Sequence, residues 1–330
     1  MSIKDEVLQD NSRQVIAYSF TPMDDILLQK HGQQWEDYRK RWSGTQDIRK
    51  ISDIPLYLLL ELNSFCNLRC KMCKHAEDDS DAEHHSMPMH IFNKIIEECN
   101  TLGIPSINIG TGTECTLHPK FQDIILRVKD SGAIDKFFLT NGSTLSDKMI
   151  DGIFEGGYER VEISVDAATK ETYEKIRKNG NYEKLERMIL KLISDKKKRN
   201  LKLPLIRLSF CVQEDNIDEI DSFYKKWEGK VDLIEYQKVS LPYVFAGGEE
   251  PLIKKCMQPF NRMTINYNGD IFACCGILYQ DRYCLGNMAD MTIYEAWHGE
   301  RMKALRESFQ TGKLMQHCRE CLLSIYGRKS

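Results

Sequence analysis

The stretch Cys66-Asn67-Leu68-Arg69-Cys70-Lys71-Met72-Cys73 is the most informative part of this 330-residue sequence. Its cysteines have the spacing Cys-x3-Cys-x2-Cys and follow the apolar run Leu56–Leu62, which predicts a buried strand. A cuboidal 4Fe–4S cluster takes four protein thiolates when it only carries electrons. Three thiolates on one short loop leave one iron open to a ligand that is not protein, which is what a catalytic metal site requires.

This octapeptide resembles the cluster loop of the radical S-adenosylmethionine (radical SAM) enzymes. The resemblance implies that S-adenosylmethionine (SAM) chelates the open iron through its amino and carboxylate groups. One electron from the cluster then cleaves the sulfonium to methionine and a 5′-deoxyadenosyl radical, which abstracts a hydrogen atom from the substrate. The alternative is a three-cysteine zinc site completed by His75, although zinc ligands usually come in pairs from two separate loops.

The composition is that of an ordinary globular enzyme. Hydrophobic residues make up 42% of the chain and charged residues 29%, and the formal net charge is −3. That charge gives no reason to expect nucleic acid or an anionic membrane as a partner. Twelve cysteines, in a sequence without a secretory signal pattern or an apolar run of membrane-spanning length, favour metal ligation in a reducing cytosol. We therefore expect a cytoplasmic protein.

From Pro55 onward, strand-like apolar segments alternate with amphipathic helical patterns. The expected strands are residues 56–62, 106–110, 135–140, 160–165, 205–212 and 231–239. The expected helices lie near residues 89–102, 119–132, 145–155, 169–176, 181–199 and 216–228. This alternation predicts βα units around a parallel sheet, and hence an α/β fold with a (β/α)6 partial TIM barrel. The catalytic residues should lie at the carboxyl ends of the strands, where four residues are expected to face the cavity: Arg207, Glu235, Tyr236 and Gln237.

Three segments of different character divide the chain. Residues 1–50 are polar and predict a helical extension that packs over the outside, with three aromatic residues on one helix face: Trp35, Tyr38 and Trp42. Residues 51–245 form the expected radical SAM core. Residues 246–330 form a smaller domain that is rich in cysteine.

The turn Gly110-Thr111-Gly112-Thr113-Glu114 follows the second expected strand and resembles the "GGE" turn of the radical SAM family. Glycine lets the backbone approach a ligand closely. Thr113 stands in place of the second glycine, and Cys115 in place of the proline that usually follows; Thr113 still keeps its backbone carbonyl. The resemblance implies that this turn binds the ammonium group of SAM through Gly112, Thr113 and Glu114.

Three more residues match positions where the family contacts its cofactor or substrate. Asn141 follows the third expected strand, Ser164 ends the fourth, and Arg177 lies beyond the next helix. Ser164 is expected near the ribose and the methionine carboxylate, and Arg177 near a carboxylate or the substrate. The alternative is ordinary turn and cap chemistry, because Ser and Asn favour such places.

A second set of cysteines follows the pattern Cys256-x12-Gly269-x4-Cys274, then a gap, then Cys318-x2-Cys321. Four thiolates close together can ligate a 4Fe–4S cube completely, whereas a zinc ribbon is the alternative. The segment resembles the SPASM/Twitch appendage of radical SAM enzymes. Because no cysteine follows Cys321 in the sequence, the segment resembles the Twitch type with one auxiliary cluster.

The local structure around these cysteines follows from two patterns. Asn268-Gly269 lies between alternating segments and predicts a type I′ hairpin, whose open end Cys256 and Cys274 flank. A helix near residues 293–309 would then return the chain to Cys318.

The reaction is less well defined than the family. The cysteine spacing is similar to that of Twitch enzymes that oxidise 2-deoxy-scyllo-inosamine, which implies a dehydrogenase for a carbohydrate or cyclitol hydroxyl. The auxiliary cluster would accept the electron, and flavodoxin or ferredoxin would reduce the core cluster. The alternatives are a peptide-modifying maturase, a non-enzymatic iron–sulfur sensor, and a radical epimerase with a cysteine as hydrogen donor: Cys115 or Cys211, or else Cys275 or Cys284.

Anaerobically reconstituted protein should hold about eight iron and eight sulfide per chain, from two cubes. The combined change of Cys66, Cys70 and Cys73 to Ala should leave about four of each. Iron, sulfide and zinc analysis measures this directly. Four iron together with bound zinc would contradict the auxiliary assignment, and about twelve iron would reveal a third cluster.

Overall fold

The structure is a computed structural model that describes residues 2–9, 15–48, 50–76, 83–238, 251, 255–278 and 280–326. Within these residues, the core is a curved sheet of parallel strands: β2 (Tyr57–Leu60), β4 (Ser106–Ile109), β5 (Asp135–Thr140), β6 (Arg160–Ser164), β8 (Leu205–Val212) and β9 (Leu233–Lys238). They lie side by side in that order. Each strand expected from the alternation is present, so the α/β class and the (β/α)6 partial barrel are confirmed.

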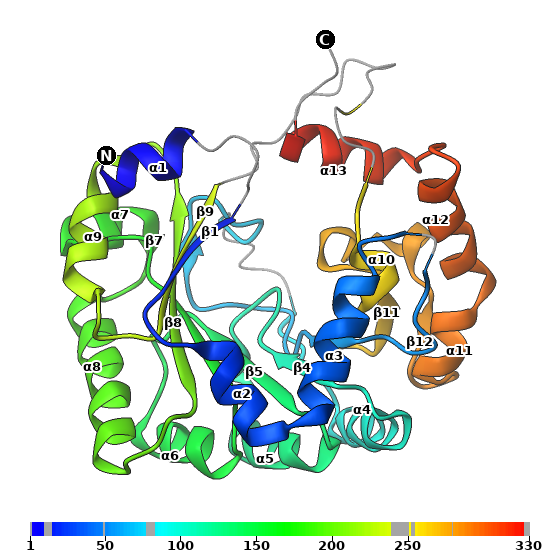
Figure 1. Ribbon diagram of the computed structural model, residues 1–330, viewed down its shortest axis with the longest axis horizontal. Helices are drawn as coiled ribbons and strands as arrows, with labels where there is room; N and C mark the ends of the chain where they lie inside the picture. Colours follow the sequence, from blue (N-terminus) through cyan, green and yellow to red (C-terminus); the bar gives the residue numbers. More distant parts are fainter. Residues whose placement is uncertain are drawn as a thin grey trace.

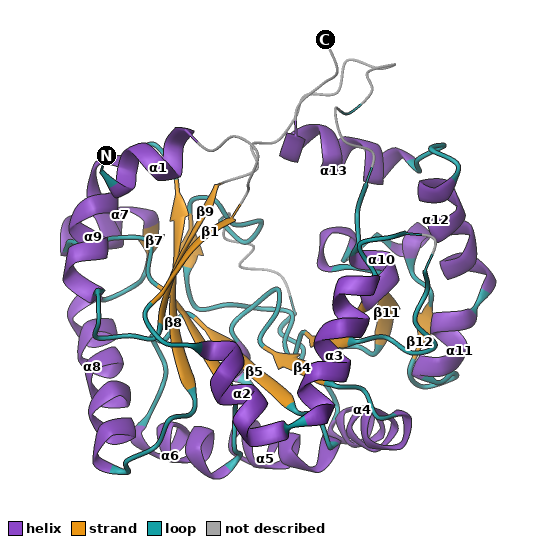
Figure 2. Ribbon diagram, in the orientation of Figure 1, coloured by secondary structure: helices purple, strands orange, loops and turns teal. Residues whose placement is uncertain are grey.

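Helices cover the outer face of this sheet, as Figure 2 shows. They are α4 (Met89–Leu102), α5 (Phe121–Arg127), α6 (Asp147–Glu155), α7 (Lys170–Ile176), α8 (Tyr182–Lys198) and α9 (Ile220–Trp227), with 3-10 turns η2 (Val128–Ser131) and η3 (Ile217–Glu219). Helix α8 shows why such segments form helices that pack on the sheet. Asn181 caps its first turn, and lysines in its last turn complement the helix dipole. Its buried stripe consists of Leu185, Ile189 and Leu192.

The N-terminal segment contains a strand that the sequence analysis did not predict. It consists of α1 (Ile3–Gln9), β1 (Val15–Ser19), α2 (Met23–His31) and α3 (Gln33–Gly44). Strand β1 pairs antiparallel with β9 and extends the sheet at that edge (Figure 1). Helix α3 buries Trp35 and Tyr38, as their spacing predicted.

The cysteine-rich segment continues the same sheet at the opposite edge. Strand β10 (Arg262–Ile265) pairs in parallel with β2, followed by antiparallel β11 (Asp270–Phe272) and β12 (Gly286–Asn287). The helices are α10 (Gln258–Asn261), α11 (Ile293–His298), α12 (Glu300–Gln310) and α13 (Gln316–Tyr326), with 3-10 turns η4 (Cys275–Ile277) and η5 (Asp281–Tyr283). The single helix expected near 293–309 is thus two helices that meet at Gly299. The expected domain boundary at residue 245 lies outside the described residues.

The β10–β11 hairpin confirms the strand pairing expected around Asn268-Gly269, but the expected turn type is wrong. Asn266 O accepts a hydrogen bond from Gly269 N at 3.0 Å, and Asn266 N donates to Asp270 O at 3.0 Å. Gly269 has φ +91°, whereas Asn268 is not among the described residues with positive φ. The connection is therefore a three-residue loop with glycine in the left-handed region, rather than a two-residue type I′ turn.

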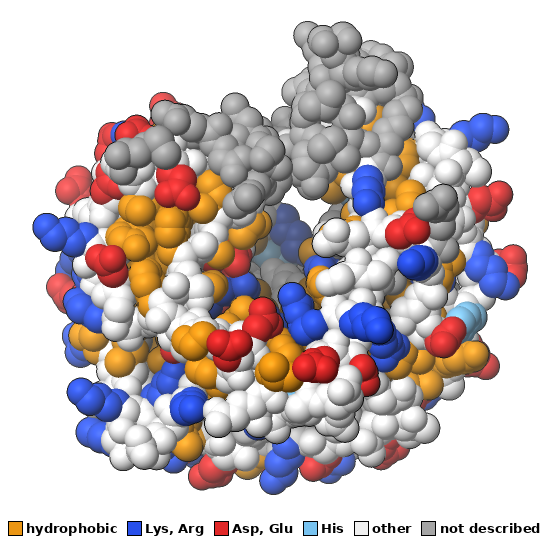
Figure 3. Space-filling model, viewed as in Figure 1, with side chains coloured by type: hydrophobic (Ala, Val, Ile, Leu, Met, Phe, Trp, Pro, Cys, Tyr) orange, Lys and Arg blue, Asp and Glu red, His pale blue; other side chains and the backbone are white. Residues whose placement is uncertain are grey.

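Two surface properties bear on possible partners. Among the described residues, no helix is both long and apolar enough to cross a membrane. Acidic and basic side chains are interspersed over the face shown in Figure 3, so the small net charge does not conceal a segregated patch on that face.

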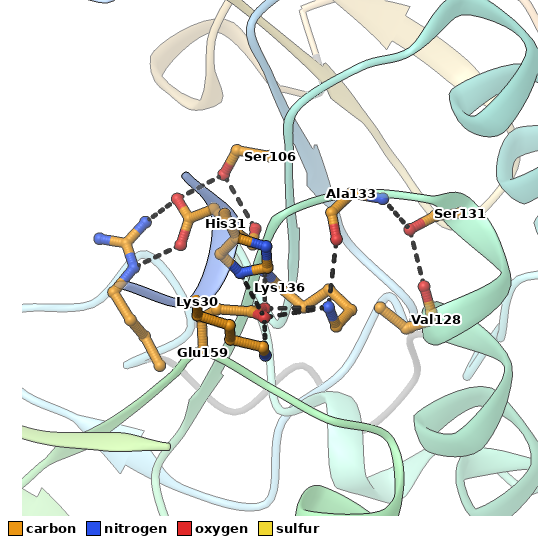
Figure 4. Close-up of polar contacts among 10 residues, drawn as sticks. Lys30, His31, Ser106, Val128, Ser131, Ala133, Lys136 and Glu159 are labelled. Atoms are coloured by element: carbon orange, nitrogen blue, oxygen red, sulfur yellow. Dashed lines mark hydrogen bonds and ion pairs between the residues drawn. The ribbon is translucent and has the colours of Figure 1, made fainter. Parts of the chain in front are cut away.

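A buried ionic cluster ties α2 to the amino ends of the strands (Figure 4). The fully buried carboxylate of Glu159 lies 2.5 Å from Lys30 Nζ, 3.2 Å from His31 Nε2 and 3.0 Å from Lys136 Nζ, and it accepts a bond from Lys136 N at 2.7 Å. Burial alone would raise the pKa of Glu159, but these partners lower it to about 2. The cluster lies opposite the carboxyl ends of the strands, at the end of a barrel that serves stability.

Glu159→Gln should therefore lower the stability of the fold by about 3 kcal/mol at neutral pH, because Lys136 stays buried without its carboxylate partner. The folded-state pKa lies below the unfolded value. This contribution is thus present above about pH 4.3 and is lost as the pH falls towards about 2. Unfolding of both proteins between neutral and acidic pH measures it, with the exposed Glu155→Gln as control. Equal stability of Glu159→Gln and wild type at neutral pH would contradict the assignment.

Candidate active site

The carboxyl ends of the parallel strands surround a cavity of about 380 Å³. All the thiols of the octapeptide line it. So does every residue that the resemblance assigned to SAM, together with Cys211: Gly112, Thr113, Glu114, Asn141, Ser164 and Arg177. The structure thus brings together, from the ends of five strands (β2, β4, β5, β6 and β8), residues that lie up to 145 positions apart in the sequence (66 to 211).

The octapeptide is held against the barrel by a short strand pair. Strand β3 (Arg69–Cys70) pairs antiparallel with β7 (Arg177–Lys178), with Cys70 opposite Arg177. Lys71 N donates to Ile176 O at 2.9 Å, and Cys73 N donates to Cys70 O at 2.9 Å. The loop backbone is therefore fixed by hydrogen bonds to the end of α7 and to β7.

Each of these thiols has an N–H donor. Asn141 Nδ2 donates to Cys66 Sγ at 3.7 Å, Arg177 Nη1 to Cys70 Sγ at 3.7 Å, and His75 N to Cys73 Sγ at 3.5 Å. Burial raises the pKa of Cys66, and it raises that of Cys70 to about 11. A metal must displace those protons, and the N–H donors then suit thiolate sulfur. The residues present therefore fit an iron–sulfur cluster with three protein ligands.

The turn after β4 lets the backbone at Gly112 come close to a ligand, whereas the carboxylate of Glu114 in the same turn is already hydrogen-bonded within the protein. Gly112 has φ +80°, and a Cβ there would lie 2.1 Å from Glu61 Oε1, so this position requires glycine. Glu114 accepts hydrogen bonds from Thr116 Oγ1 at 2.5 Å, Thr140 Oγ1 at 2.7 Å and Asn141 N at 2.7 Å. Its carboxylate thus joins the ends of β4 and β5. Its expected contact with the SAM ammonium stays a prediction.

Behind Arg177 lies Asp166, two residues beyond the end of β6. Asp166 has φ +66°, and its Oδ2 accepts from Arg177 Nε at 2.8 Å and pairs with Nη2 at 2.6 Å. Its Oδ1 accepts a bond from Cys211 N at 2.7 Å. Ser164 lines the cavity beside Ser209, with 3.4 Å between their hydroxyl oxygens. The ends of β6 and β8 are therefore linked through Asp166.

The structure separates the two first-named hydrogen-donor candidates. Cys211 lines the cavity, and burial raises its pKa to about 12. Cys115 is 1% exposed, donates to Leu139 O at 3.4 Å and is not part of the cavity lining. Its expected access to the substrate is therefore not supported, because its side chain packs in the core beneath η1 (Cys115–Leu117).

The cavity has a polar floor formed by Glu162, Ser209 and Gln237, of which the sequence analysis singled out only Gln237. Behind it, Arg207 is ion-paired with Glu162 and lies 2.7 Å from Glu235 Oε2. The sequence did offer one indication of this polar surface, namely Glu162. It is a charged residue in a central strand of a parallel sheet, where most residues are apolar.

Tyr236, expected to face the cavity, points to the other side of the sheet. Its hydroxyl donates to Ile220 O at 2.9 Å, and its ring packs on Phe210 and Phe223. Alternation along β9 explains this, since Glu235 and Gln237 take the cavity side.

The auxiliary cysteines also converge. Helix α13 carries Cys318 and Cys321 one turn apart. A negative charge on Cys256 would raise the pKa of both thiols, so all three are close enough to interact electrostatically. Burial raises the pKa of Cys256 and Cys274, and that of Cys318 to about 12. Within the described part of the chain, no three His, Cys, Asp or Glu side chains are grouped tightly enough for a single metal ion. Four thiolates are the ligand set of a fully ligated 4Fe–4S cube.

One further thiol of this group, Cys275, was named from the sequence only as a candidate hydrogen donor. The exposed Cys275 follows Cys274 and interacts electrostatically with Cys256 and Cys321. It also lies near Lys74, which in turn lies near Cys73. The two cysteine groups therefore approach one another at this lysine.

The sequence matches the radical SAM superfamily over residues 60–226 and the SPASM iron–sulfur cluster-binding domain over residues 256–322. This chain belongs to the radical SAM superfamily, and its C-terminal part is of the SPASM type. The two domains imply SAM, a core 4Fe–4S cluster and auxiliary iron–sulfur binding, in place of the zinc alternatives.

Solved structures share the fold. SuiB from Streptococcus suis, bound to S-adenosylmethionine, has a TM-score of 0.62 and 13% identity, covering 90% of this chain and 81% of its own. BtrN, in complex with AdoMet and 2-DOIA, has a TM-score of 0.53 and 15% identity, covering 81% of this chain and 92% of its own. At these identities the likeness shows the fold alone.

A curated relative matches mainly the core. The GTP 3',8-cyclase of Clostridium perfringens (strain 13 / Type A) is 30% identical over 182 residues, which is 54% of this chain and 53% of the cyclase. The chain thus spans about half the length of the curated relatives it matches, and their substrate does not transfer with the match.

With dithionite or reduced flavodoxin, the reconstituted protein should convert SAM to 5′-deoxyadenosine and methionine without substrate. Cys70→Ala should abolish this, because two thiolates no longer hold the cluster with an open iron. Cys99→Ala, a thiol buried beneath α4, is the matched control. Chromatography of the nucleoside products measures both. S-adenosylhomocysteine as the main product would indicate methyl transfer and contradict the assignment.

Proposed function

We propose that this protein is a radical SAM dehydrogenase that oxidises a hydroxyl of a carbohydrate or cyclitol to a ketone. The observation that carries the proposal is the polar floor of Glu162, Ser209 and Gln237, which lines the same cavity as the octapeptide thiols. A polyhydroxylated substrate needs several hydrogen-bonding groups in a confined space, and a buried polar group without a partner is costly. An apolar or peptide-sized substrate would not need such a floor.

In this proposal the core cluster is held by Cys66, Cys70 and Cys73, and the auxiliary cluster by four further thiols: Cys256, Cys274, Cys318 and Cys321. When bound, the core cluster with SAM supplies a hydrogen-abstracting radical, and the auxiliary cluster supplies an electron acceptor. The Gly112 turn, with Asn141 and Ser164, borders the space for SAM. Flavodoxin or ferredoxin is the proposed reductant.

Glu162 is the proposed base. Oxidation of a carbinol to a ketone removes a hydrogen atom, a proton and an electron, so a proton acceptor must lie beside the substrate. Glu162 lines the cavity, and Arg207 pairs with it from behind. Gln237 is fixed by its bond to Glu235 Oε1 at 2.5 Å and supplies a further polar contact.

The structural neighbours are consistent with this function. BtrN, whose solved complex contains AdoMet and 2-DOIA, shares the fold over 81% of this chain and 92% of its own. The relation to GTP 3',8-cyclases is confined to about half of the chain, so it supports the shared core rather than a nucleotide substrate.

The second candidate is a radical epimerase, which the position of Cys211 favours. Cys211 lines the same cavity as the octapeptide thiols and the polar floor, and its pKa of about 12 keeps the sulfur protonated at neutral pH. A protonated thiol is what returns a hydrogen atom to a carbon radical. Cys115 lacks this access because it is buried in the core.

A panel of cyclitols, aminocyclitols and hexoses, incubated with SAM and reductant in heavy water, separates the two. Dehydrogenation should give a product lighter by two hydrogens with no deuterium bound to carbon. Glu162→Gln should lower product formation at least tenfold while SAM cleavage continues, since only the base is lost. Mass spectrometry of substrate and product is the measurement.

The opposite outcome is a product of unchanged composition that carries deuterium at one carbon. In that case Cys211→Ala should block product formation, whereas Cys115→Ala should not. This result would overturn the dehydrogenase proposal in favour of the epimerase.

A further inference from the structure

Arg177 contacts the core cluster loop in two independent ways. Its backbone pairs with that of Cys70 across the β3–β7 ladder, and its Nη1 donates to Cys70 Sγ at 3.7 Å. The side chain is 9% exposed, so its charge is poorly screened by water. The sequence resemblance placed Arg177 among residues for a carboxylate or the substrate, but its closest chemical group on this loop is a cluster sulfur.

The other guanidinium nitrogens are held by Asp166. Nε lies 2.8 Å and Nη2 lies 2.6 Å from the same carboxylate oxygen. Asp166 is 1% exposed and is itself fixed by bonds from Cys211 N at 2.7 Å and from Asn216 Nδ2 to its backbone oxygen at 2.9 Å. Each nitrogen of the guanidinium thus has a protein partner, and the positive end of the pair is the one nearer Cys70.

We propose that the Arg177–Asp166 pair sets the reduction potential of the core cluster, with Arg177 raising it and Asp166 lowering it. Reduction adds one negative charge to the cluster. A cation and an N–H donor at a ligand sulfur stabilise the reduced state more than the oxidised one, so they favour electron uptake. The carboxylate behind the guanidinium offsets part of that charge, which makes the two residues opposed controls on the same equilibrium.

This proposal predicts shifts of opposite sign. Arg177→Gln should disfavour the reduced core cluster roughly tenfold, equivalent to about 59 mV for one electron, because both the charge and its N–H contact are lost. Asp166→Asn should move the equilibrium the other way, because the guanidinium charge is no longer offset. Arg177→Lys keeps the positive charge but loses the planar set of guanidinium N–H donors. Its shift in reduction potential should therefore be smaller than that of Arg177→Gln.

Lys178→Gln is the matched control. Lys178 is the other residue of β7, it is exposed, and its loss changes the net charge by the same amount. A solvent-screened charge should leave the potential within error of wild type.

The experiment is a potentiometric titration followed by electron paramagnetic resonance, on anaerobically reconstituted full-length protein without SAM. Iron and sulfide analysis first confirms that each variant holds both clusters, and the auxiliary signal provides an internal reference that should not move. Binding of SAM to each variant is measured separately by calorimetry.

Opposite shifts for Arg177→Gln and Asp166→Asn, with none for Lys178→Gln, support the proposal. An unchanged potential in Arg177→Gln overturns it, whether or not SAM binding weakens. Shifts of the same sign in both variants also overturn it, because they indicate damage to the loop rather than opposed charges. If Arg177→Gln does not retain its cluster, Arg177→Lys and Asp166→Asn decide, and failure of Asp166→Asn to raise the potential is then the contradicting result.

Discussion

Burial of thiol, guanidinium and carboxylate groups beside one another, at the carboxyl edge of the parallel sheet, is the constraint on which the site depends. A buried polar group needs a partner, so each group fixes its neighbour. Glu114 joins β4 to β5, Asp166 joins β6 to β8, and the β3–β7 ladder joins the cluster loop to the barrel. The cavity is therefore defined by hydrogen bonds among the protein's own groups.

The auxiliary segment shares that rigidity because β10 continues the sheet from β2. Trp297 Nε1 donates to Ser52 O at 2.7 Å, and the buried Arg306 donates to Trp297 O at 2.8 Å. The auxiliary cysteines are thus anchored to the strand that leads into the octapeptide. A fixed separation between two redox sites is what an enzyme needs if one accepts an electron produced near the other, which is the proposed role of the auxiliary cluster.

The parts of the fold that the sequence predicted are those with local signals. Apolar alternation located each core strand, and cysteine spacing located both metal sites. Strand β1 escaped prediction because its partner β9 is more than 200 residues away and nothing local requires the pairing. Tyr236 was assigned to the wrong face of the sheet. Alternation along a strand shows which residues share a face, but not which of the two faces points into the cavity. Arg177 was recognised as a site residue, but its contact with Cys70 was not predicted. That contact depends on the pairing of β3 with β7, and strands of two residues are too short to give a sequence pattern.

The central claim is that Cys66, Cys70 and Cys73 hold a cluster whose open iron meets SAM inside the cavity. Electron–nuclear double resonance of the reduced protein, with SAM carrying an isotopically labelled amino group, tests this most directly. The account predicts a coupling between the label and one of the two clusters, lost when the three cysteines are changed to Ala while the auxiliary cluster remains. No coupling in a protein that holds both clusters, or a coupling that survives the triple change, would contradict it.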